Sequence, residues 1–243
     1  MKPSNAQLRK SLLDACRILD HYGLLRAYGH ASARTADGKG MLITPRKALG
    51  LVRSPSEMIL ADLDGNRMSS GKRARAGSRS KSKALLPLEY FLHTEVYRVR
   101  PDVRAICRTH GMFAQVMSVL RRPLRPVHEL AVPLGLEVPI FDTPALISSQ
   151  EIGRRMAHAL GSAGALLLRG NGALVIGATV EEAVVNAIHM ETSAEIQWRA
   201  LCVGEPAWIT GDEFSGEFAR LAKREYEAVL RPWKYYLAKS RGR

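Results

Sequence analysis

The sequence has few of the features that mark secreted, membrane-embedded or disulfide-linked proteins. Its 243 residues include three cysteines, Cys16, Cys107 and Cys202, which are far apart and lie among apolar neighbours. An odd and scattered set predicts reduced, packed thiols and no disulfide framework or zinc knot. No apolar run approaches the roughly 20 residues of a membrane span, and the start MKPSNAQLRK lacks the hydrophobic core of a signal peptide. We therefore expect a cytoplasmic protein that does not engage a membrane.

Acidic residues are scarce beside basic ones, which leaves a net charge of +13. Much of the excess falls in two segments with little apolar content, residues 72–83 (KRARAGSRSKSK) and 234–243. Such runs are typical of solvated loops and chain ends. Because neither interleaved aromatic residues nor a known reader motif accompanies the charge, we expect no nucleic-acid partner. The basic loop is expected to help attract a small anionic substrate by long-range steering.

The hydrophobic periodicity alternates between helical and strand patterns without an internal repeat. This alternation predicts an α/β protein with a mixed or antiparallel sheet, and the length suits one domain although two smaller ones would also fit. We assign a single domain to residues 1–243, with its core at 5–205, a basic loop at 72–85 and a C-terminal extension at 206–243. The expected helices cover 5–27, which Gly29 ends, the region around Glu89, a stretch from Met112, 149–160 and 179–203. The expected strands lie near 31–34, 40–43, 58–62 and 105–110, in the proline-rich 121–144, and on both sides of Gly170-Asn171-Gly172.

The segment LPLEYFLHTEVYRVRPDVRAICRTH, residues 86–110, carries the most specific chemistry. Glu89 and His93 are four residues apart in a helical pattern, so their side chains lie one turn apart on the same face. Pro101 breaks the helix, and the strand that follows points Arg108 and His110 to one side. A His-x-His pair on a strand commonly offers two imidazoles to a metal. Here the first member is a guanidinium, which is always charged and never accepts a hydrogen bond.

Five motifs in order resemble the class II aldolase/adducin family over residues 5–205. They are GHASAR (29–34), ITPR (43–46), LPLE...H...Y...RPDV (86–103), RTHG (108–111) and LLRGNGALVIG (167–177). The sequence around LPLE, RPDV and RPVHELAVPLG is most similar to the branch that decarboxylates hydroxylated aromatic or pyridine carboxylates. The resemblance implies a three-layer α/β/α sandwich with a largely antiparallel sheet, and a C4 tetramer with active sites between subunits. It also implies a divalent metal, such as Zn, Mn or Fe, held by three histidines near a proton-transferring glutamate.

When the family's site residues are carried over one by one, this sequence departs from the family pattern at the metal ligands. Glu89 matches the acid/base and His110 the second ligand, whereas Arg108 and Asn171 stand in the places of the first and third ligands. One imidazole and one amide are too few for tight binding, and a neighbouring guanidinium repels a cation. The sequence therefore disfavours a resident divalent metal, and His110 would be a weak ligand only if one binds. Arg108 is predicted to replace the metal by stabilising a developing oxyanion, away from the carboxylate that leaves as CO2.

The predicted activity is a lyase reaction, the decarboxylation of a small hydroxylated aromatic or heteroaromatic carboxylate. The predicted catalytic residues are Glu89, Arg108 and His110. The resemblance implies further substrate-binding residues, namely His30, Ser32, Thr44, Arg46, His128 and Asn171. Two other interpretations stay open. The chain could be a non-catalytic, adducin-like scaffold, against which the retention of Glu89 argues, or a repurposed enzyme that runs an elimination, a hydration or an oxidative decarboxylation.

Overall fold

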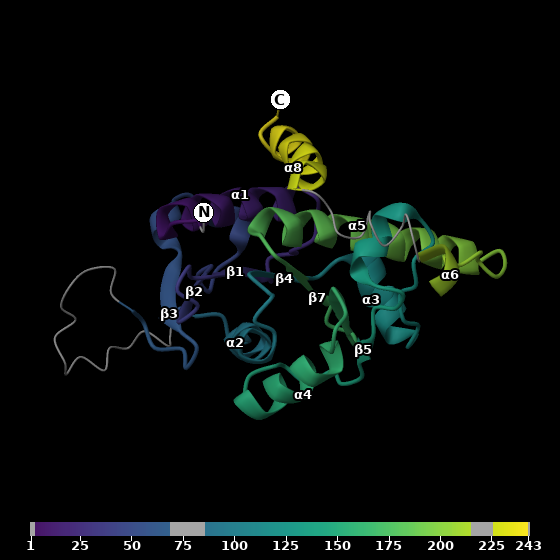
Figure 1. Ribbon diagram of the computed structural model, residues 1–243, viewed down its shortest axis with the longest axis horizontal. Helices are drawn as coiled ribbons and strands as arrows, with labels where there is room; N and C mark the ends of the chain where they lie inside the picture. Colours follow the sequence, from purple (N-terminus) through teal and green to yellow (C-terminus); the bar gives the residue numbers. More distant parts are fainter. Residues whose placement is uncertain (1–2, 69–85, 215–225, 243) are drawn as a thin grey trace.

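A seven-stranded sheet forms the middle layer of the protein (Figure 1). The computed structural model describes residues 3–68, 86–214 and 226–242, so the predicted basic loop at 72–85 lies outside the described residues. The strands follow the order β3-β2-β1-β4-β7-β6-β5. Every neighbouring pair is antiparallel except β5 and β6, which are parallel, and this confirms the predicted mixed, largely antiparallel sheet. The strands are β1 (His30–Arg34), β2 (Gly40–Ile43), β3 (Ile59–Asp62), β4 (Ala105–Thr109), β5 (Ile140–Phe141), β6 (Ala165–Leu168) and β7 (Ala173–Gly177).

Helices cover both faces of this sheet, which confirms the predicted three-layer sandwich. Helices α1 and α5 lie on one face and α2 and α4 on the other, while α8 packs outside α1 and α5 (Figure 1). Within the described ranges, none of the helices combines the length and apolar character that crossing a membrane would require. The α-helices are α1 (Asn5–His21), α2 (Tyr90–Val99), α3 (Met112–Val119), α4 (Gln150–Leu160), α5 (Val180–Leu201), α6 (Gly211–Phe214) and α8 (Tyr226–Ser240), and short 3-10 helices cover Leu49–Leu51, Pro55–Glu57 and Glu129–Leu134.

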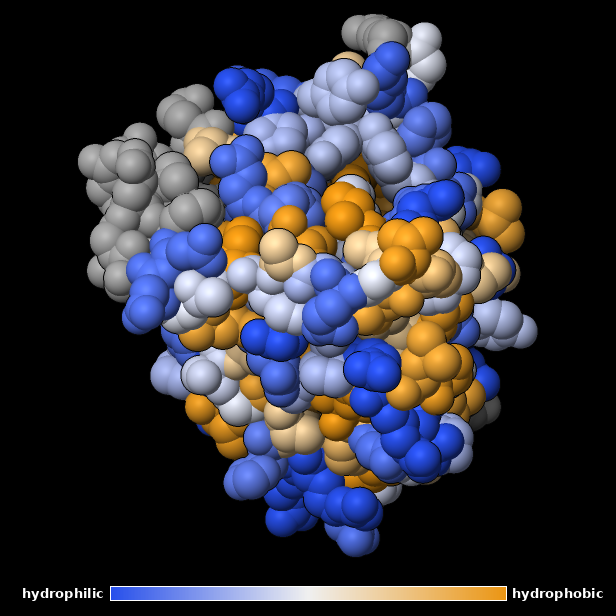
Figure 2. Space-filling model, turned by 90° about the vertical axis from the view of Figure 1, so that its right-hand side faces the viewer, coloured by the Kyte–Doolittle hydropathy of each residue, from blue (hydrophilic) through white to orange (hydrophobic). Residues whose placement is uncertain are grey.

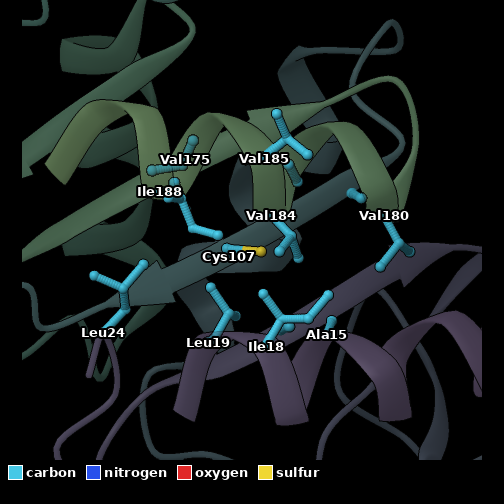
Figure 3. Close-up of a cluster of buried hydrophobic side chains, with 14 of the residues drawn as sticks. Ala15, Ile18, Leu19, Leu24, Cys107, Val175, Val180, Val184, Val185 and Ile188 are labelled. Atoms are coloured by element: carbon cyan, nitrogen blue, oxygen red, sulfur yellow. The ribbon is translucent and has the colours of Figure 1, made fainter. Parts of the chain in front are cut away.

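The central strand β4 shows how the two faces differ in chemistry. Alternate residues of a strand point to opposite sides, and Cys107 points into the apolar core between the sheet, α1 and α5. Figure 3 shows its thiol between Val184 of α5 and Leu19 of α1. Arg108, the next residue, points to the opposite face, which α2 covers. The sheet thus places a guanidinium inside the protein on the α2 side.

Two predicted elements differ from those found. The first helix ends at His21 and not near Gly29, because Gly23 takes a left-handed conformation with φ of 68° and the backbone N–H of Leu24 donates to Leu19. The backbone N–H of Gly23 also donates to Asp20, and the two bonds form a Schellman motif, which satisfies carbonyls of the last helical turn. The proline-rich segment 121–144 is only partly extended. It contains the 3-10 helix Glu129–Leu134, and β5 is its only strand within the described chain.

The turn between β6 and β7 brings Asn171 to the edge of the site. Gly170 and Gly172 have φ angles of 68° and 82°, which glycine adopts without strain. A Cβ atom on Gly172 would collide with the carbonyl oxygen of Thr109. The backbone of this turn therefore packs directly against the end of β4, and this close approach sets the position of Asn171 beside residues 108–110.

Candidate active site

The buried polar residues on the α2 side come from three separate elements. In the register of β1 against β4, His30 lies directly opposite Arg108. Their neighbours Ala31 and Cys107 pack into the other core, so His30 and Arg108 share the face that α2 covers. Glu89 is the residue that precedes the first turn of α2. Strand pairing and helix docking thus bring an imidazole, a guanidinium and a carboxylate together, although 59 or more positions separate His30 from the other two in the sequence.

Both carboxylate oxygens of Glu89 accept hydrogen bonds. Oε2 accepts from Nε of Arg108 at 3.2 Å, and Oε1 accepts from the backbone N–H of Ile147 at 3.1 Å and from Nδ2 of Asn171 at 3.4 Å. Burial by itself would raise the pKa of Glu89, but His30, Arg108 and the Ile147 N–H favour the charged form and lower the pKa to about 2. The side chain is therefore a carboxylate at neutral pH and is able to accept a proton.

Arg108 is completely buried, with a relative exposure of 0%. Besides its bond to Glu89, its Nη1 donates to the carbonyl oxygen of Thr109 at 2.6 Å. Its Nη2 has no hydrogen-bond partner among the described residues. Burial lowers the pKa of Arg108 and the adjacent carboxylate of Glu89 raises it, and a guanidinium stays protonated in such a pair. The residue is a fixed buried cation whose Nη2 amino group is unpaired in the described part of the chain.

A cavity of about 510 Å³ opens next to these residues. Its polar lining includes Glu89, His30, His110 and Asn171, and the solvent-exposed Arg46 and Lys47 form its cationic side. Its apolar lining comes from Ala27, Pro45, Ala48, Pro87, Leu88 and Leu146. A volume of this size with mostly apolar walls and a few convergent polar groups is typical of small-molecule sites. The arrangement suits a small molecule that carries an anionic group.

The structure brings five of the predicted site residues to this cavity: Glu89, His30, Arg46, His110 and Asn171. The described lining residues do not include the other four predicted site residues, Arg108, Ser32, Thr44 and His128.

Three of these four residues lie in the protein interior. Arg108 is packed beside Glu89, and Ser32 is buried in β1 with an exposure of 1%. Thr44 accepts the backbone N–H of Ala31 through its hydroxyl at 3.1 Å. His128 precedes the 3-10 helix Glu129–Leu134. The functional roles assigned to the nine residues stay predictions.

His110 directly follows β4 and lines the cavity. Burial and the charge of Arg108 lower the pKa of His110 to about 3, so its imidazole is neutral at physiological pH. Its ring lies edge-on to Tyr28, with 6.2 Å between the ring centroids. Its backbone N–H donates to the carbonyl oxygen of Leu24 at 2.6 Å, which fixes the strand end against the segment after α1. A neutral imidazole here can donate one hydrogen bond and accept another.

The donor atoms around His110 do not fit the three-histidine metal site that the family resemblance implies. Arg108 offers only N–H donors, and the amide of Asn171 directs Nδ2 toward Glu89. The carboxylate of Glu89 already accepts from Arg108. A catalytic zinc site ordinarily has three protein ligands, and of the three positions that match the family's ligands only 110 carries an imidazole. The expectation of no resident metal stays a prediction.

Three residues of the site region were not among the site residues predicted from the sequence. The helical spacing placed His93 on the face of Glu89, but nothing in the sequence indicated its partners, which are His30 and Ser32. Tyr97 joins them through Ser32. Glu191 of α5 accepts the backbone N–H groups of Phe113 and Ala114 at 2.7 and 3.2 Å, and so it caps α3 directly after His110.

Comparison with known proteins identifies the family. Residues 10–198 match the model of the Class II Aldolase and Adducin N-terminal domain, and the chain belongs to this family, as the five motifs predicted.

Two curated relatives and one solved structure illustrate the range of similar proteins. The chain is 29% identical over 214 residues to a 5-methylthioribulose-1-phosphate/5-deoxyribulose-1-phosphate aldolase from Rhodospirillum rubrum, covering 88% of this chain and 90% of that protein. It is 30% identical over 210 residues to a 3,4-dihydroxyphthalate decarboxylase from Arthrobacter keyseri, covering 83% and 82%. The solved L-fuculose 1-phosphate aldolase from Glaciozyma antarctica PI12 superposes with a TM-score of 0.78 at 22% identity, covering 98% and 90%, which supports the fold.

Proposed function

We propose that this protein is a carbon–carbon lyase that decarboxylates a small hydroxylated aromatic or heteroaromatic carboxylate. The observation that carries the proposal is the buried, ionised Glu89 beside an apolar cavity whose outer side carries Arg46 and Lys47. The apolar walls suit a ring, the exposed cations suit its anionic group, and Glu89 suits the exchange of a proton with it. The similarity to the Arthrobacter keyseri decarboxylase supports the same assignment.

In the proposed reaction, Glu89 first accepts the proton of a ring hydroxyl. The approach of an anionic substrate raises the pKa of Glu89, because a second negative charge disfavours the ionised form. The protonated Glu89 then delivers this proton to the ring carbon that carries the carboxylate. The carbon–carbon bond breaks, CO2 leaves, and the bonding electrons restore the aromatic phenolate, which takes a proton from solvent. Atoms and charge balance without an oxidant.

Arg108 is proposed to act in the place that a metal cation has in the family. Its positive charge holds Glu89 ionised before substrate binds, and it stabilises negative charge that develops on the ring oxygen near Oε2 of Glu89. A fixed charge in a buried site needs no reorganisation during the reaction, and losing one such donor costs roughly 3 to 4 kcal/mol in other enzymes. The Nη2 amino group of Arg108 supports this role, because it has no acceptor in the described part of the chain, although Arg108 lies behind Glu89 and does not itself line the cavity.

The test is turnover of 3,4-dihydroxyphthalate, followed by CO2 release, with metal analysis of the same protein. We expect turnover that EDTA leaves unchanged, no stoichiometric metal, and a loss of at least 100-fold in Arg108→Ala and Glu89→Gln. Stoichiometric metal together with loss of activity in EDTA would overturn the role of Arg108. Absence of turnover across a panel of hydroxylated aryl and pyridyl carboxylates would overturn the decarboxylase assignment.

A sugar-phosphate aldolase is the second candidate. Arg46 and Lys47 are also suited to a phosphate group, and the similarity to the Rhodospirillum rubrum aldolase favours this reaction. The same panel should therefore include 5-deoxyribulose 1-phosphate, whose cleavage would select this alternative.

We also propose that the chain forms a homotetramer in the cytoplasm, with its sites at subunit interfaces and without a nucleic-acid partner. Apolar groups lie between charged residues on the face seen in Figure 2, at the end of the molecule that carries α3 and α6. On and next to α3, Met112, Val119 and Leu120 are 45%, 58% and 54% exposed, which supports burial of this surface in an assembly. Light scattering at micromolar concentration should give the mass of four chains, and a monomer would contradict the proposal.

A further inference from the structure

A chain of hydrogen bonds runs from the cavity into the protein interior behind Glu89. Nδ1 of His30 lies 2.6 Å from Nε2 of His93, and Nδ1 of His93 lies 2.7 Å from the hydroxyl oxygen of Ser32. That oxygen lies 2.8 Å from the hydroxyl oxygen of Tyr97. All four side chains are buried, and of the four only His30 is among the lining residues of the cavity. The geometry joins a residue at the cavity to a tyrosine that does not reach it.

The two imidazoles of this chain are neutral. Burial lowers the pKa of His30, and it lowers the pKa of His93 well below the ordinary value, because the desolvated charged ring is unfavourable. A neutral imidazole has one N–H donor and one acceptor nitrogen. One of the two rings therefore donates in the bond between them, and this choice decides whether Nδ1 of His93 accepts from the Ser32 hydroxyl or donates to it.

The groups at the two ends select the same direction. At the cavity end, Nε2 of His30 lies 3.8 Å from Oε2 of the ionised Glu89, which favours a proton on Nε2 and makes Nδ1 the acceptor. His93 then donates from Nε2 to His30, and its Nδ1 accepts the Ser32 hydroxyl.

At the inner end, the Ser32 oxygen accepts the hydroxyl of Tyr97, which stays protonated because burial raises the pKa of Tyr97. In the opposite direction, His93 would donate to the Ser32 oxygen. Either the Ser32 or the Tyr97 hydroxyl proton would then have no acceptor, since among the described residues no other hydrogen bond of these two hydroxyls is seen. An unpaired buried donor of this kind is unfavourable.

We propose that His93, Ser32 and Tyr97 are positioning residues that hold His30 in the tautomer with its proton on Nε2. His30 thereby presents an N–H donor to the cavity next to the carboxylate of Glu89. The inference rests on the proposed function in one respect, which is that the acceptor of this N–H is an oxygen of the anionic aromatic substrate. A donor beside a base lets the site bind an oxygen and remove a proton within the same small volume.

The decisive measurement is the tautomer of His30 in the full-length protein, by long-range ¹H–¹⁵N NMR with labelled histidine. The chain has seven histidines, and the signal absent from the His30→Gln spectrum assigns His30. We expect the proton on Nε2 in the native protein. His93→Leu removes the donor to Nδ1 and should produce a population with the proton on Nδ1. His93→Gln keeps an N–H donor and an oxygen acceptor and should restore the native pattern.

Binding of 3,4-dihydroxyphthalate, measured by calorimetry, gives a second readout. We expect about ten-fold weaker binding in His93→Leu and near-native binding in His93→Gln, since one hydrogen bond to an anion is affected. His158→Gln on the exposed side of α4 is the matched control and should change neither the tautomer nor the affinity. If His93→Leu does not fold, Tyr97→Phe, which removes only the hydroxyl, should move the tautomer in the same direction.

Three results would overturn the proposal: a native His30 with its proton on Nδ1, a tautomer in His93→Leu that matches the His158→Gln control, or a His93→Gln variant that behaves like His93→Leu. A native protein that does not bind the dihydroxyphthalate would count against the proposed function. The NMR result would still decide the role of the hydrogen-bond chain, so the two failures are distinguishable.

Discussion

Replacing Arg108 with methionine would leave the carboxylate of Glu89 buried without its guanidinium partner. The ion pair joins Nε and Oε2 at 3.2 Å, and the two side chains are 0% and 8% exposed. Removing one member of a buried pair costs about 3 to 5 kcal/mol, because the other charge stays uncompensated. For a chain of this length, we expect the melting temperature at pH 8 to fall by roughly 6 to 20 °C.

The loss of stability in Arg108→Met should depend on pH. In the native protein, the pKa of Glu89 is lowered from 4.5 to about 2, so its contribution is complete above pH 4.5 and is lost only as the pH falls toward 2. Without the guanidinium, burial is opposed only by His30 and the Ile147 N–H, so the folded-state pKa of Glu89 rises above its native value. The carboxylate then contributes less to stability at high pH, and the deficit relative to the native protein should shrink as the pH falls through the raised pKa toward 2.

Thermal unfolding followed by circular dichroism at a series of pH values measures both effects. Arg121→Met is a matched control, because its pair with Asp142 is 66% and 50% exposed and should contribute less than about 1 kcal/mol at any pH. Glu89→Gln combined with Arg108→Met removes both charges and should be more stable at pH 8 than Arg108→Met alone. A deficit that is the same at pH 3 and pH 8, or a double variant whose loss equals the sum of the single losses, would refute the reasoning.

Three further predictions concern the turn, the thiols and the cavity. Gly172→Ala should destabilise the protein by more than about 1 kcal/mol in urea unfolding, because it places a side chain at positive φ against a backbone carbonyl. The control Gly204→Ala places its side chain in open space and should leave the stability unchanged. Equal unfolding midpoints for the two variants would contradict this prediction. Iodoacetamide should label one thiol per native chain, that of Cys202, because the other two are buried; rapid labelling of all three would show otherwise. Arg46→Met and Lys47→Met should each weaken binding of 3,4-dihydroxyphthalate by roughly two- to five-fold, with the difference reduced at high salt, and an effect independent of salt would argue against a charge contribution.

The elements that the sequence predicted well have local signals at both ends. For α4, Ser149 is the residue before the first turn and accepts the N–H of Ile152, and Gly161 follows the last residue. The β6–β7 turn is marked by Gly170 and Gly172, which adopt the positive φ that glycine favours. Local chemistry at these positions decides the structure, so the sequence alone predicts these elements.

The end of α1 and the 3-10 helix Glu129–Leu134 are two features that the sequence pattern did not predict. The segment after α1 offers both Gly23 and Gly29 as possible stops, and apolar residues at helical spacing continue between them. The choice of Gly23 lets Leu24 pack in the core and accept the backbone N–H of His110. That contact is tertiary, and therefore the sequence pattern alone does not reveal it.

The candidate site likewise has a part that the sequence predicted and a part that it did not. Motif order and spacing pointed to Glu89 and to Arg108, but not to their direct ion pair. The chain from His30 to Tyr97 depends on how α2 docks against β1. This docking is a product of tertiary packing. The part of the site that lies in one stretch of sequence was predictable, and the part that joins distant strands was not.

The cap that Glu191 places on α3 has a consequence for how this protein can change over evolutionary time. The carboxylate of Glu191 occupies the space in which any side chain at position 111 would have to lie, so glycine there and glutamate on α5 constrain each other. Enlarging the first expels the second and uncaps the helix next to His110. Shortening the second leaves room for alanine but leaves the N–H groups of Phe113 and Ala114 unsatisfied. Single substitutions at either position are thus costly steps, and drift at this edge of the cavity requires paired changes on two helices that are about 80 residues apart in the chain.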